Sequence, residues 1–164
     1  MDSQPPCHTP LPIRMILALD TLQRFDMASF PTLTINEKAS VRVARGHLWV
    51  FSNEVSKTGG TPESGSEVAV LSHKREFLGS ALFNKKALIQ ARIFSRKSES
   101  FTSELLSSRL DTALERRRRL LPGRRSCRLV FGDSDLLPGL VVDRYEDVLA
   151  VQFLTLAMEQ RREE

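Results

Sequence analysis

Hydrophobic and polar residues follow different patterns in three successive parts of the chain. Residues 1–31 hold five of the eight prolines and show little periodicity, so we expect an irregular N-terminal extension there. Residues 32–98 contain short apolar runs separated by glycine, serine and charged residues, which is the pattern of short strands. Residues 99–164 begin with a helical pattern and continue with further strand patterns. The sequence therefore predicts an extension followed by two folded units.

The middle part, residues 32–98, is expected to form a small β-barrel. A strand is predicted at Leu33–Ile35, and Asn36 is a suitable N-cap for a helical segment that continues to about Arg45. The glycine- and serine-rich residues 58–66 predict a loop. The further strand candidates are Glu67–Ser72, Phe77–Phe83 and Ile89–Phe94. Strands of this length and spacing are typical of a small barrel.

The last part, residues 99–164, is expected to form a helix followed by antiparallel strands. Apolar residues recur at steps of three and four from Phe101 to Leu121, which predicts one amphipathic helix of about five turns. A second helix is expected to begin near Ala157 and to run to the end of the sequence, so this unit looks cut at its C-terminus. The strand candidates are Arg128–Phe131, Leu140–Asp143 and Val148–Phe153. The predicted fold class is mainly β with α+β character.

Composition excludes several classes of protein. A hydrophobic fraction of 41% and a charged fraction of 27% are those of a globular chain. No apolar run reaches the roughly 18 residues that a membrane span needs. Cys7 and Cys127 are far apart and the three histidines are scattered, so we expect neither a disulfide framework nor a metal site. We expect a cytoplasmic protein without a membrane partner.

Positive charge is concentrated in the middle part of the chain. Residues 32–98 hold eleven lysines and arginines against five acids, whereas each flanking part has a net charge of −1. Such an excess suits a surface that binds a polyanion, although many domains with similar charge bind nothing. Phosphate contacts of this kind orient an RNA backbone without reading much sequence. The candidate RNA-binding residues are Arg42, Arg45, His47, Lys85, Lys86, Arg92 and Arg96.

Two further features of the sequence have a structural and a functional interpretation. Seven arginines lie between Arg116 and Arg128, near the end of the predicted long helix. Cations there complement the helix dipole, which is the favoured interpretation, and a second RNA contact is the alternative. The only tryptophan, Trp49, lies in an apolar cluster, which favours a core position over a base-stacking platform.

No catalytic residue is predicted in this chain. It has no glycine-rich turn between a strand and a helix, and no Ser-His-Asp or Cys-His set can be argued. The string Gly132–Tyr145 contains Asp133 and Asp135 beside a Pro-Gly pair. Two carboxylates are too few for a calcium loop, and these residue types favour turns, so the string is interpreted as a structural turn.

Two strings resemble one known family. Arg45–Ser52, with the sequence Arg-Gly-His-Leu-Trp-Val-Phe-Ser, and Gly132–Tyr145 lie about eighty residues apart. In this order they resemble the bacterial SAM-dependent ribosomal-RNA large-subunit methyltransferases that modify cytosine at C5. The resemblance implies a PUA domain, which is an RNA-binding β-barrel, at residues 32–98, and an α/β connector at residues 99–164. In the family a Rossmann-like catalytic domain follows.

The resemblance also implies what this chain lacks. The SAM-binding loop and the attacking cysteine of the family lie beyond its end, and neither Cys7 nor Cys127 matches that cysteine's motif. We therefore expect no catalytic residue, cofactor site or metal site here, with S-adenosylmethionine serving a full-length relative. Two residues depart from the family pattern, namely Leu48 in place of a usual proline and Glu146 in place of a common hairpin glycine.

The resemblance implies a function in binding and positioning. The chain is expected to dock ribosomal RNA as the N-terminal portion of an rRNA methyltransferase, without catalysing the reaction by itself. Two alternatives remain open. One is a stand-alone RNA-binding or ribosome-assembly module, and the other is an inactive fragment that associates with itself through exposed connector surface.

Overall fold

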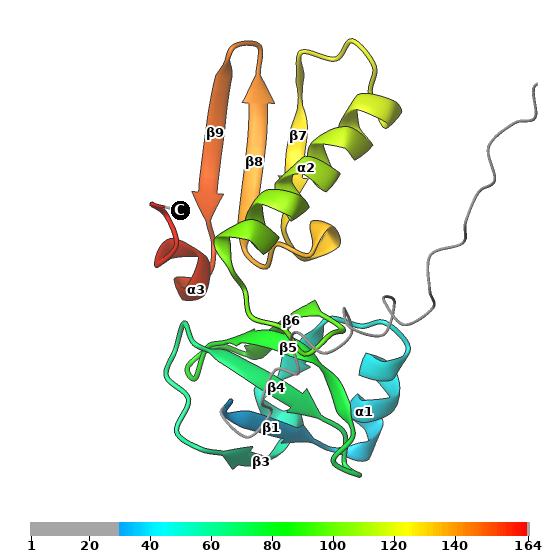
Figure 1. Cartoon of the computed structure of the whole chain (residues 1–164), viewed down its shortest axis with the longest axis vertical. Coiled ribbons are helices and arrows are strands. Elements are labelled where there is room, and N and C mark those ends of the chain that lie inside the picture. The colour runs from blue at the N-terminus through cyan, green and yellow to red at the C-terminus, as the bar shows by residue number, and fades with distance from the viewer. Residues whose placement is uncertain (1–29, 164) are drawn as a thin grey trace, which may run out of the picture.

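The computed structural model describes residues 30–163, which form two stacked units (Figure 1). The first is a curled six-stranded sheet closed by a short helix, and the second is a three-stranded sheet covered by a long helix. The expected fold of a barrel followed by a helix and antiparallel strands is confirmed. The predicted N-terminal extension lies outside the described residues. The boundary that we propose near residue 98 falls in the connection between the units.

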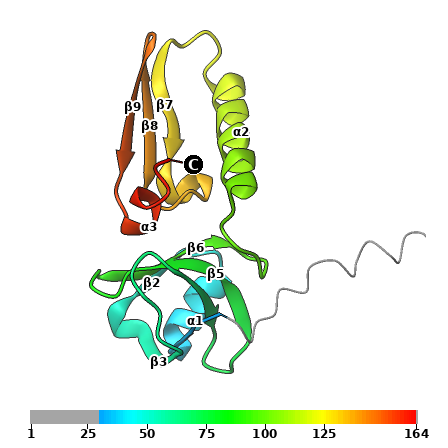
Figure 2. The same ribbon diagram turned by 60° about the vertical axis from the view of Figure 1, so that its left-hand side comes forward.

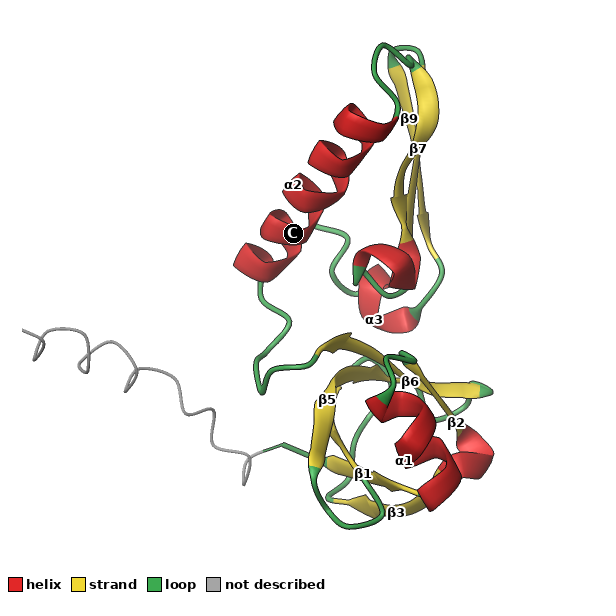
Figure 3. Ribbon diagram, turned by 90° about the vertical axis from the view of Figure 1, so that its right-hand side faces the viewer, coloured by secondary structure: helices red, strands yellow, loops and turns green. Residues whose placement is uncertain are grey.

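The first unit is a sheet of strand order β2-β6-β5-β4-β1-β3, in which β1 and β4 pair in parallel and the other neighbours pair antiparallel. Helix α1 lies against the curled sheet (Figure 3) and contributes Ala39 and Val43 to its core. The elements are β1 Thr32–Ile35, α1 Glu37–Ala44, β2 Trp49–Phe51, the 3-10 turn η2 Ser52–Glu54, β3 Val55–Gly59, β4 Glu67–Leu71, β5 Phe77–Phe83 and β6 Ile89–Ser95.

Local sequence signals explain the start and end of α1. The Asn36 side chain accepts a hydrogen bond from the Ala39 amide at 2.9 Å, as predicted for an N-cap. Gly46 follows the helix with a φ of 110°, a conformation that favours glycine because a side chain would be strained. The next residue but one, Leu48, packs against the barrel core. The chain thus reverses direction immediately before β2.

The second unit is a sheet of strand order β7-β8-β9, with α2 packed on one face (Figure 2). Thr102 caps α2 by accepting from the Leu105 amide at 3.3 Å. The expectation that the last helix runs to the end of the sequence is wrong, since α3 spans only four residues. The elements are α2 Ser103–Leu120, β7 Ser126–Phe131, the 3-10 turn η3 Gly132–Asp135, β8 Leu140–Tyr145, β9 Val148–Phe153 and α3 Leu156–Glu159.

The two units share a hydrophobic core. Leu82 of β5 and Phe94 of β6 belong to the barrel, yet they pack with residues of α2, β7, β8 and α3 rather than with the barrel interior. The rings of Phe94 and Phe101 meet edge to face, with centroids 5.0 Å apart. β6 is therefore buried on both faces at its C-terminal end, and the barrel is fixed against the connector.

In the turn between β8 and β9, Glu146 occupies the position at which glycine was expected. Glu146 has a φ of 55°, while the next residue, Asp147, does not have a positive φ. Replacing Glu146 with glycine is expected to raise the free energy of unfolding by about 0.5–1 kcal/mol, because glycine adopts this conformation without strain. The exposed ion pair with Arg125 that the change removes contributes little. Urea denaturation measures the gain.

The neighbouring turn position serves as the control for this change. Asp147→Gly adds the same backbone freedom where no positive φ has to be relieved, so it is expected to lose stability slightly. A gain for both variants, or for neither, would contradict strain at Glu146.

Candidate nucleic-acid interface

Trp49 and Arg92 lie side by side on the β2–β6 ladder and face the connector. They are direct partners in the antiparallel pairing, and the Arg92 guanidinium lies 5.3 Å from the centre of the Trp49 ring. Asp133 of η3 accepts from Trp49 Nε1 at 2.8 Å and from Arg92 at 2.5 Å. The expected core position of Trp49 is wrong, because the ring is half-buried at the junction of the two units. Nothing in the local apolar pattern points to a partner 84 residues away.

Arg42 organises the turn that follows α1. Its guanidinium donates to both carboxylate oxygens of Glu54, at 2.8 and 2.6 Å, and to the Trp49 carbonyl at 3.2 Å. It also contacts His47 Nδ1, which accepts from the Trp49 amide at 3.1 Å. Arg42 and His47 therefore hold the turn in shape, and most of the Arg42 hydrogen-bonding capacity is used within the chain.

The remaining candidate cations are exposed. Arg45 follows the last residue of α1, and Lys85 and Lys86 lie in the turn between β5 and β6. The backbone amides of this turn donate to Ser64 Oγ and Asn84 Oδ1, at 3.0 and 3.2 Å. Both lysine side chains thus extend from a turn whose backbone is fixed.

Arg96 lies directly after β6. Its guanidinium donates to the carbonyls of Leu78 and His47, each at 3.1 Å, which brings it to the turn organised by Arg42. Partial burial lowers the pKa of Arg96 from its ordinary value. Arg96 therefore connects the end of β6 to the string Arg45–Ser52.

The predicted site residues form an elongated strip rather than one compact cluster. Lys85 and Lys86 precede β6, Arg92 lies within it, and Arg96 follows it. A strand of this length spans roughly 20 Å, so the two lysines and Arg96 mark opposite ends of the strip. Such a strip matches several consecutive phosphates of an extended strand. We call it the barrel strip below.

Two acidic residues of η3 were not among the predicted site residues, yet they connect the strip to the connector. Asp133 faces the barrel, as described above. Asp135 faces α2, where its two oxygens accept from Arg117 at 2.7 and 2.6 Å, and it also accepts from the Phe131 amide at 2.7 Å. The interpretation of this string as a structural turn is confirmed. Through Asp133 and Asp135, η3 is held between the barrel and α2.

The described residues offer neither a metal site nor a membrane-spanning helix. Within residues 30–163, no three His, Cys, Asp or Glu side chains are grouped so that they could hold a metal ion. In the same part of the chain, no helix is both long and apolar enough to cross a bilayer. Cys127 is a free, half-buried thiol on β7, and Cys7 lies outside the described residues.

The described residues do not fit an adenosyl cofactor. Such cofactors are bound where a strand leads through a glycine-rich turn into a helix, because close backbone approach needs residues without a side chain. In the part of the chain that the structure describes, three connections lead from a strand into an α-helix, before α1, α2 and α3, and none contains glycine. Residues 30–163 thus contain no glycine-rich connection of this kind.

The chain is similar in sequence to one known domain family and to several ribosomal RNA methyltransferases. Residues 33–96 match the family described as the PUA-like domain. The chain is 36% identical over 123 residues to the ribosomal RNA large subunit methyltransferase I of Shewanella denitrificans, covering 73% of this chain and 31% of that protein. It is 30% identical over 135 residues to the protein of the same name from Vibrio cholerae, covering 81% of this chain and 34% of that protein. The chain thus spans about a third of the length of the curated relatives it matches.

Solved structures share the fold. A protein described as a SAM-dependent methyltransferase from Streptococcus mutans superposes with a TM-score of 0.70 at 19% identity, covering 80% of this chain and 35% of that chain. At this identity the likeness concerns the fold alone. Together with the family match, it confirms a PUA-like barrel followed by an α/β unit.

Proposed function

We propose that this chain is the RNA-binding, substrate-positioning portion of a ribosomal RNA methyltransferase that modifies cytosine at C5. The observation that carries the proposal is a PUA-like barrel with a strip of cations along β6, fixed to the connector through Asp133. The similarity to ribosomal RNA large subunit methyltransferases supports RNA as the partner. In this proposal the described residues bind and position the RNA and do not themselves transfer the methyl group.

The cations of the strip have different roles in this proposal. Arg45, Lys85, Lys86 and Arg96 are exposed and contact RNA phosphates, because their side chains reach solvent. Arg42 and Arg92 are paired with Glu54 and Asp133, so they fix the shape of the surface and add partial positive charge at its centre. His47 contributes at the rim through its carbonyl contact with Arg96.

Positioning follows from the rigid link between the two units. A phosphate-bound RNA is oriented relative to the barrel, and the barrel is oriented relative to the connector by the shared core and Asp133. In a full-length protein this fixes the distance from the bound RNA to the reacting base. Holding reactants in place lowers the entropic part of a reaction barrier without any chemical step by the holder.

RNA binding is tested by titrating the chain with a fluorescent single-stranded RNA at several salt concentrations. Four phosphate contacts predict a slope of about −3 for the logarithm of the binding constant against the logarithm of salt concentration. Lys85→Glu combined with Lys86→Glu is expected to weaken binding about tenfold and to make the slope shallower by about 1.4. Fluorescence anisotropy measures both quantities.

Lys74 provides the matched control for this variant. It is exposed in the turn at the other end of β5, so Lys74→Glu removes the same kind of charge away from Lys85 and Lys86. We expect Lys74→Glu to change the affinity by less than about twofold. A slope near zero, or equal losses for both variants, would refute the barrel strip as the RNA-binding surface.

Self-association is a second candidate function. β9 forms a free edge of its sheet, and Val148, Leu149 and Val151 on it are exposed. Uncharged edge strands of this kind tend to pair with other chains. If association is the function, sedimentation velocity shows concentration-dependent dimers that RNA does not alter, and the Lys85 and Lys86 variant leaves RNA binding unchanged.

A further inference from the structure

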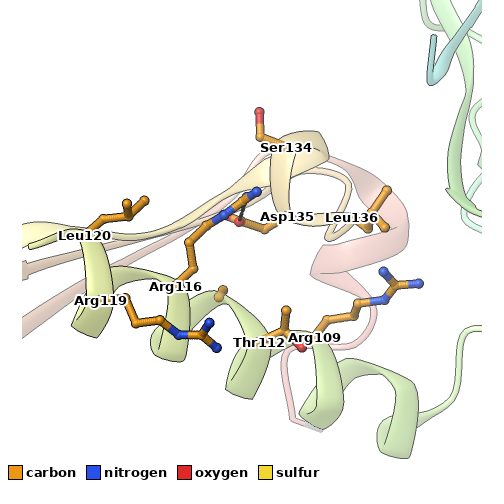
Figure 4. A pocket seen from close by; sticks show the side chains of 9 residues that line it. Arg109, Thr112, Arg116, Arg119, Leu120, Ser134, Asp135 and Leu136 are labelled. Atoms are coloured by element: carbon orange, nitrogen blue, oxygen red, sulfur yellow. Dashed lines mark hydrogen bonds and ion pairs between the residues drawn. The ribbon is translucent and has the colours of Figure 1, made fainter. Parts of the chain in front are cut away.

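A basic groove lies on the connector, outside the barrel strip. It is formed between α2 and η3 and has a volume of about 630 Å³ (Figure 4). Its lining includes Arg109, Arg116, Arg119, Leu120, Asp135 and Leu136. Three arginines of one helix therefore border a single cavity.

The groove carries an excess of positive charge. Its one lining acid, Asp135, is bound in a bidentate manner by Arg117, which lies on a neighbouring face of α2 and does not line the cavity. Arg116 approaches Asp135 only at 3.5 Å, and Arg119 pairs with the exposed Glu115 at 3.0 Å. The Arg119–Glu115 pair is exposed, and surface pairs of this kind contribute little and are readily exchanged for another anion. Arg109, Arg116 and Arg119 are thus available to an anionic ligand.

The helix dipole does not account for all three arginines. Cations in the last turn of a helix are stabilised by the dipole, which covers Arg119. Arg109 lies in the first half of α2, where the dipole gives a cation no such advantage. It is held instead by a 3.4 Å hydrogen bond to the Phe94 carbonyl of β6. The structure therefore places a half-buried cation where the groove meets the barrel.

This position brings one end of the groove close to the barrel strip. Phe94 lies on β6 two residues before Arg96, which directly follows the strand, so Arg109 lies close to the end of the strip. η3 forms the opposite wall and contacts β6 through Asp133 and Arg92. The apolar side chains of Leu120 and Leu136 complete the walls and suit the sugar and base faces of a nucleotide.

We propose that this groove binds the phosphodiester backbone of RNA that extends past the barrel strip. The inference rests on the proposed RNA-binding function and adds a second contact surface to it. The chain then engages a longer RNA than the barrel alone accommodates. Short RNA fills the barrel strip, and only longer RNA reaches Arg109, Arg116 and Arg119.

The test compares RNAs of two lengths. Arg116→Gln combined with Arg119→Gln removes two cations whose side chains are 59% and 75% exposed, so the fold is expected to be unaffected. For an RNA of about twenty nucleotides, this variant is expected to lower the affinity about fivefold and to make the salt slope shallower by about 1.4. For an RNA of about six nucleotides, the affinity stays within about twofold. Fluorescence anisotropy with the full chain measures both.

A matched control separates position from net charge. Arg118→Gln combined with Arg125→Gln also removes two exposed arginines, and neither residue lines this groove. We expect this variant to bind both RNAs within about twofold of the unchanged chain. Equal losses for the two variants, or no loss for the groove variant, would overturn the inference.

The outcomes also distinguish the inference from the proposed function. If both RNAs bind, Lys85→Glu with Lys86→Glu weakens both, and the longer RNA binds no tighter than the shorter one, the groove inference fails alone. If neither RNA binds, the proposed function fails with it. If ATP or inorganic phosphate at equal phosphate concentration displaces the longer RNA as effectively as unlabelled RNA does, the groove is a small-anion site and the inference is wrong.

Discussion

Replacing Asp135 with asparagine is expected to lower the free energy of unfolding by about 3 kcal/mol at pH 7, as removal of one partner from a buried ion pair does. The Asp135 side chain is 3% exposed and its partner Arg117 is 15% exposed, so solvent screens the pair weakly. Asparagine keeps the shape but leaves the Arg117 guanidinium without a counter-charge. Urea denaturation followed by circular dichroism measures the loss.

The stability lost in Asp135→Asn is expected to depend on pH. Burial opposes ionisation of Asp135, but hydrogen bonds from Arg117 and the Phe131 amide and the charges of Arg117 and Arg116 outweigh it, so the pKa lies below its ordinary value of 3.8. A lowered pKa contributes stability that is present above the ordinary value and lost as the pH falls through the folded-state pKa. The free energies of unfolding of the Asp135→Asn variant and of the unchanged chain are therefore expected to converge as the pH falls through the pKa of Asp135.

An exposed aspartate controls for a general effect of charge removal. Asp147 pairs with Arg125 at 3.1 Å, and its side chain is 87% exposed. Asp147→Asn is expected to change the free energy of unfolding by less than about 0.5 kcal/mol. Parallel stability curves for Asp135→Asn and the unchanged chain across the acid range would contradict the role given to the Asp135–Arg117 pair.

Local signals were sufficient to predict most elements of the fold. β5 and β9 begin and end at the predicted residues, because their apolar runs are bounded by turn-forming residues. Asn36 caps α1 as expected, because its side chain acts only three residues away. Information of this kind lies within a few positions of the chain, where sequence patterns can be recognised.

Errors arose where partners distant in the sequence decide the outcome. β3 was not among the predicted strands, and its last two residues fall in the predicted loop at residues 58–66. Three of its five residues are exposed and polar, and only pairing with β1 makes it a strand. Alternation in β6 identified Ile93 as buried, but Phe94 is buried as well, since the connector covers the outer face. A period-two pattern marks one buried face and gives no sign of the second.

In the candidate site, too, partners distant in the sequence could not be predicted. Sequence reasoning identified the cations of the barrel strip but treated all of them as free, whereas Arg42 and Arg92 are paired with Glu54 and Asp133. Charge counting cannot show these pairs, because their partners lie 12 and 41 residues away. The string that holds Asp133 was unusual enough to be singled out, and only the structure shows that it joins the two units.

Replacing Asp133 with alanine is expected to lower the free energy of unfolding by about 2–3 kcal/mol, because it breaks the ion pair and the hydrogen bond between barrel and connector. The change removes the acceptor of Trp49 Nε1 and leaves Arg92 without its ion-pair partner. Both side chains of the ion pair are largely buried, at 17% exposure for Asp133 and 24% for Arg92. Trp49 is the only tryptophan, so its fluorescence during urea denaturation reports on this junction.

A second variant, in which Arg92 is also replaced, tests how much of the loss comes from the unpaired guanidinium. Adding Arg92→Leu to Asp133→Ala removes the unpaired cation and places an apolar side chain beside Trp49, so part of the lost stability is expected to return. Glu115→Ala, which breaks an exposed pair on α2, is the control and is expected to cost less than about 0.5 kcal/mol. If Asp133→Ala costs no more than this control, the two units are held together by their shared apolar core alone. In that case the orientation of bound RNA relative to the connector does not depend on Asp133.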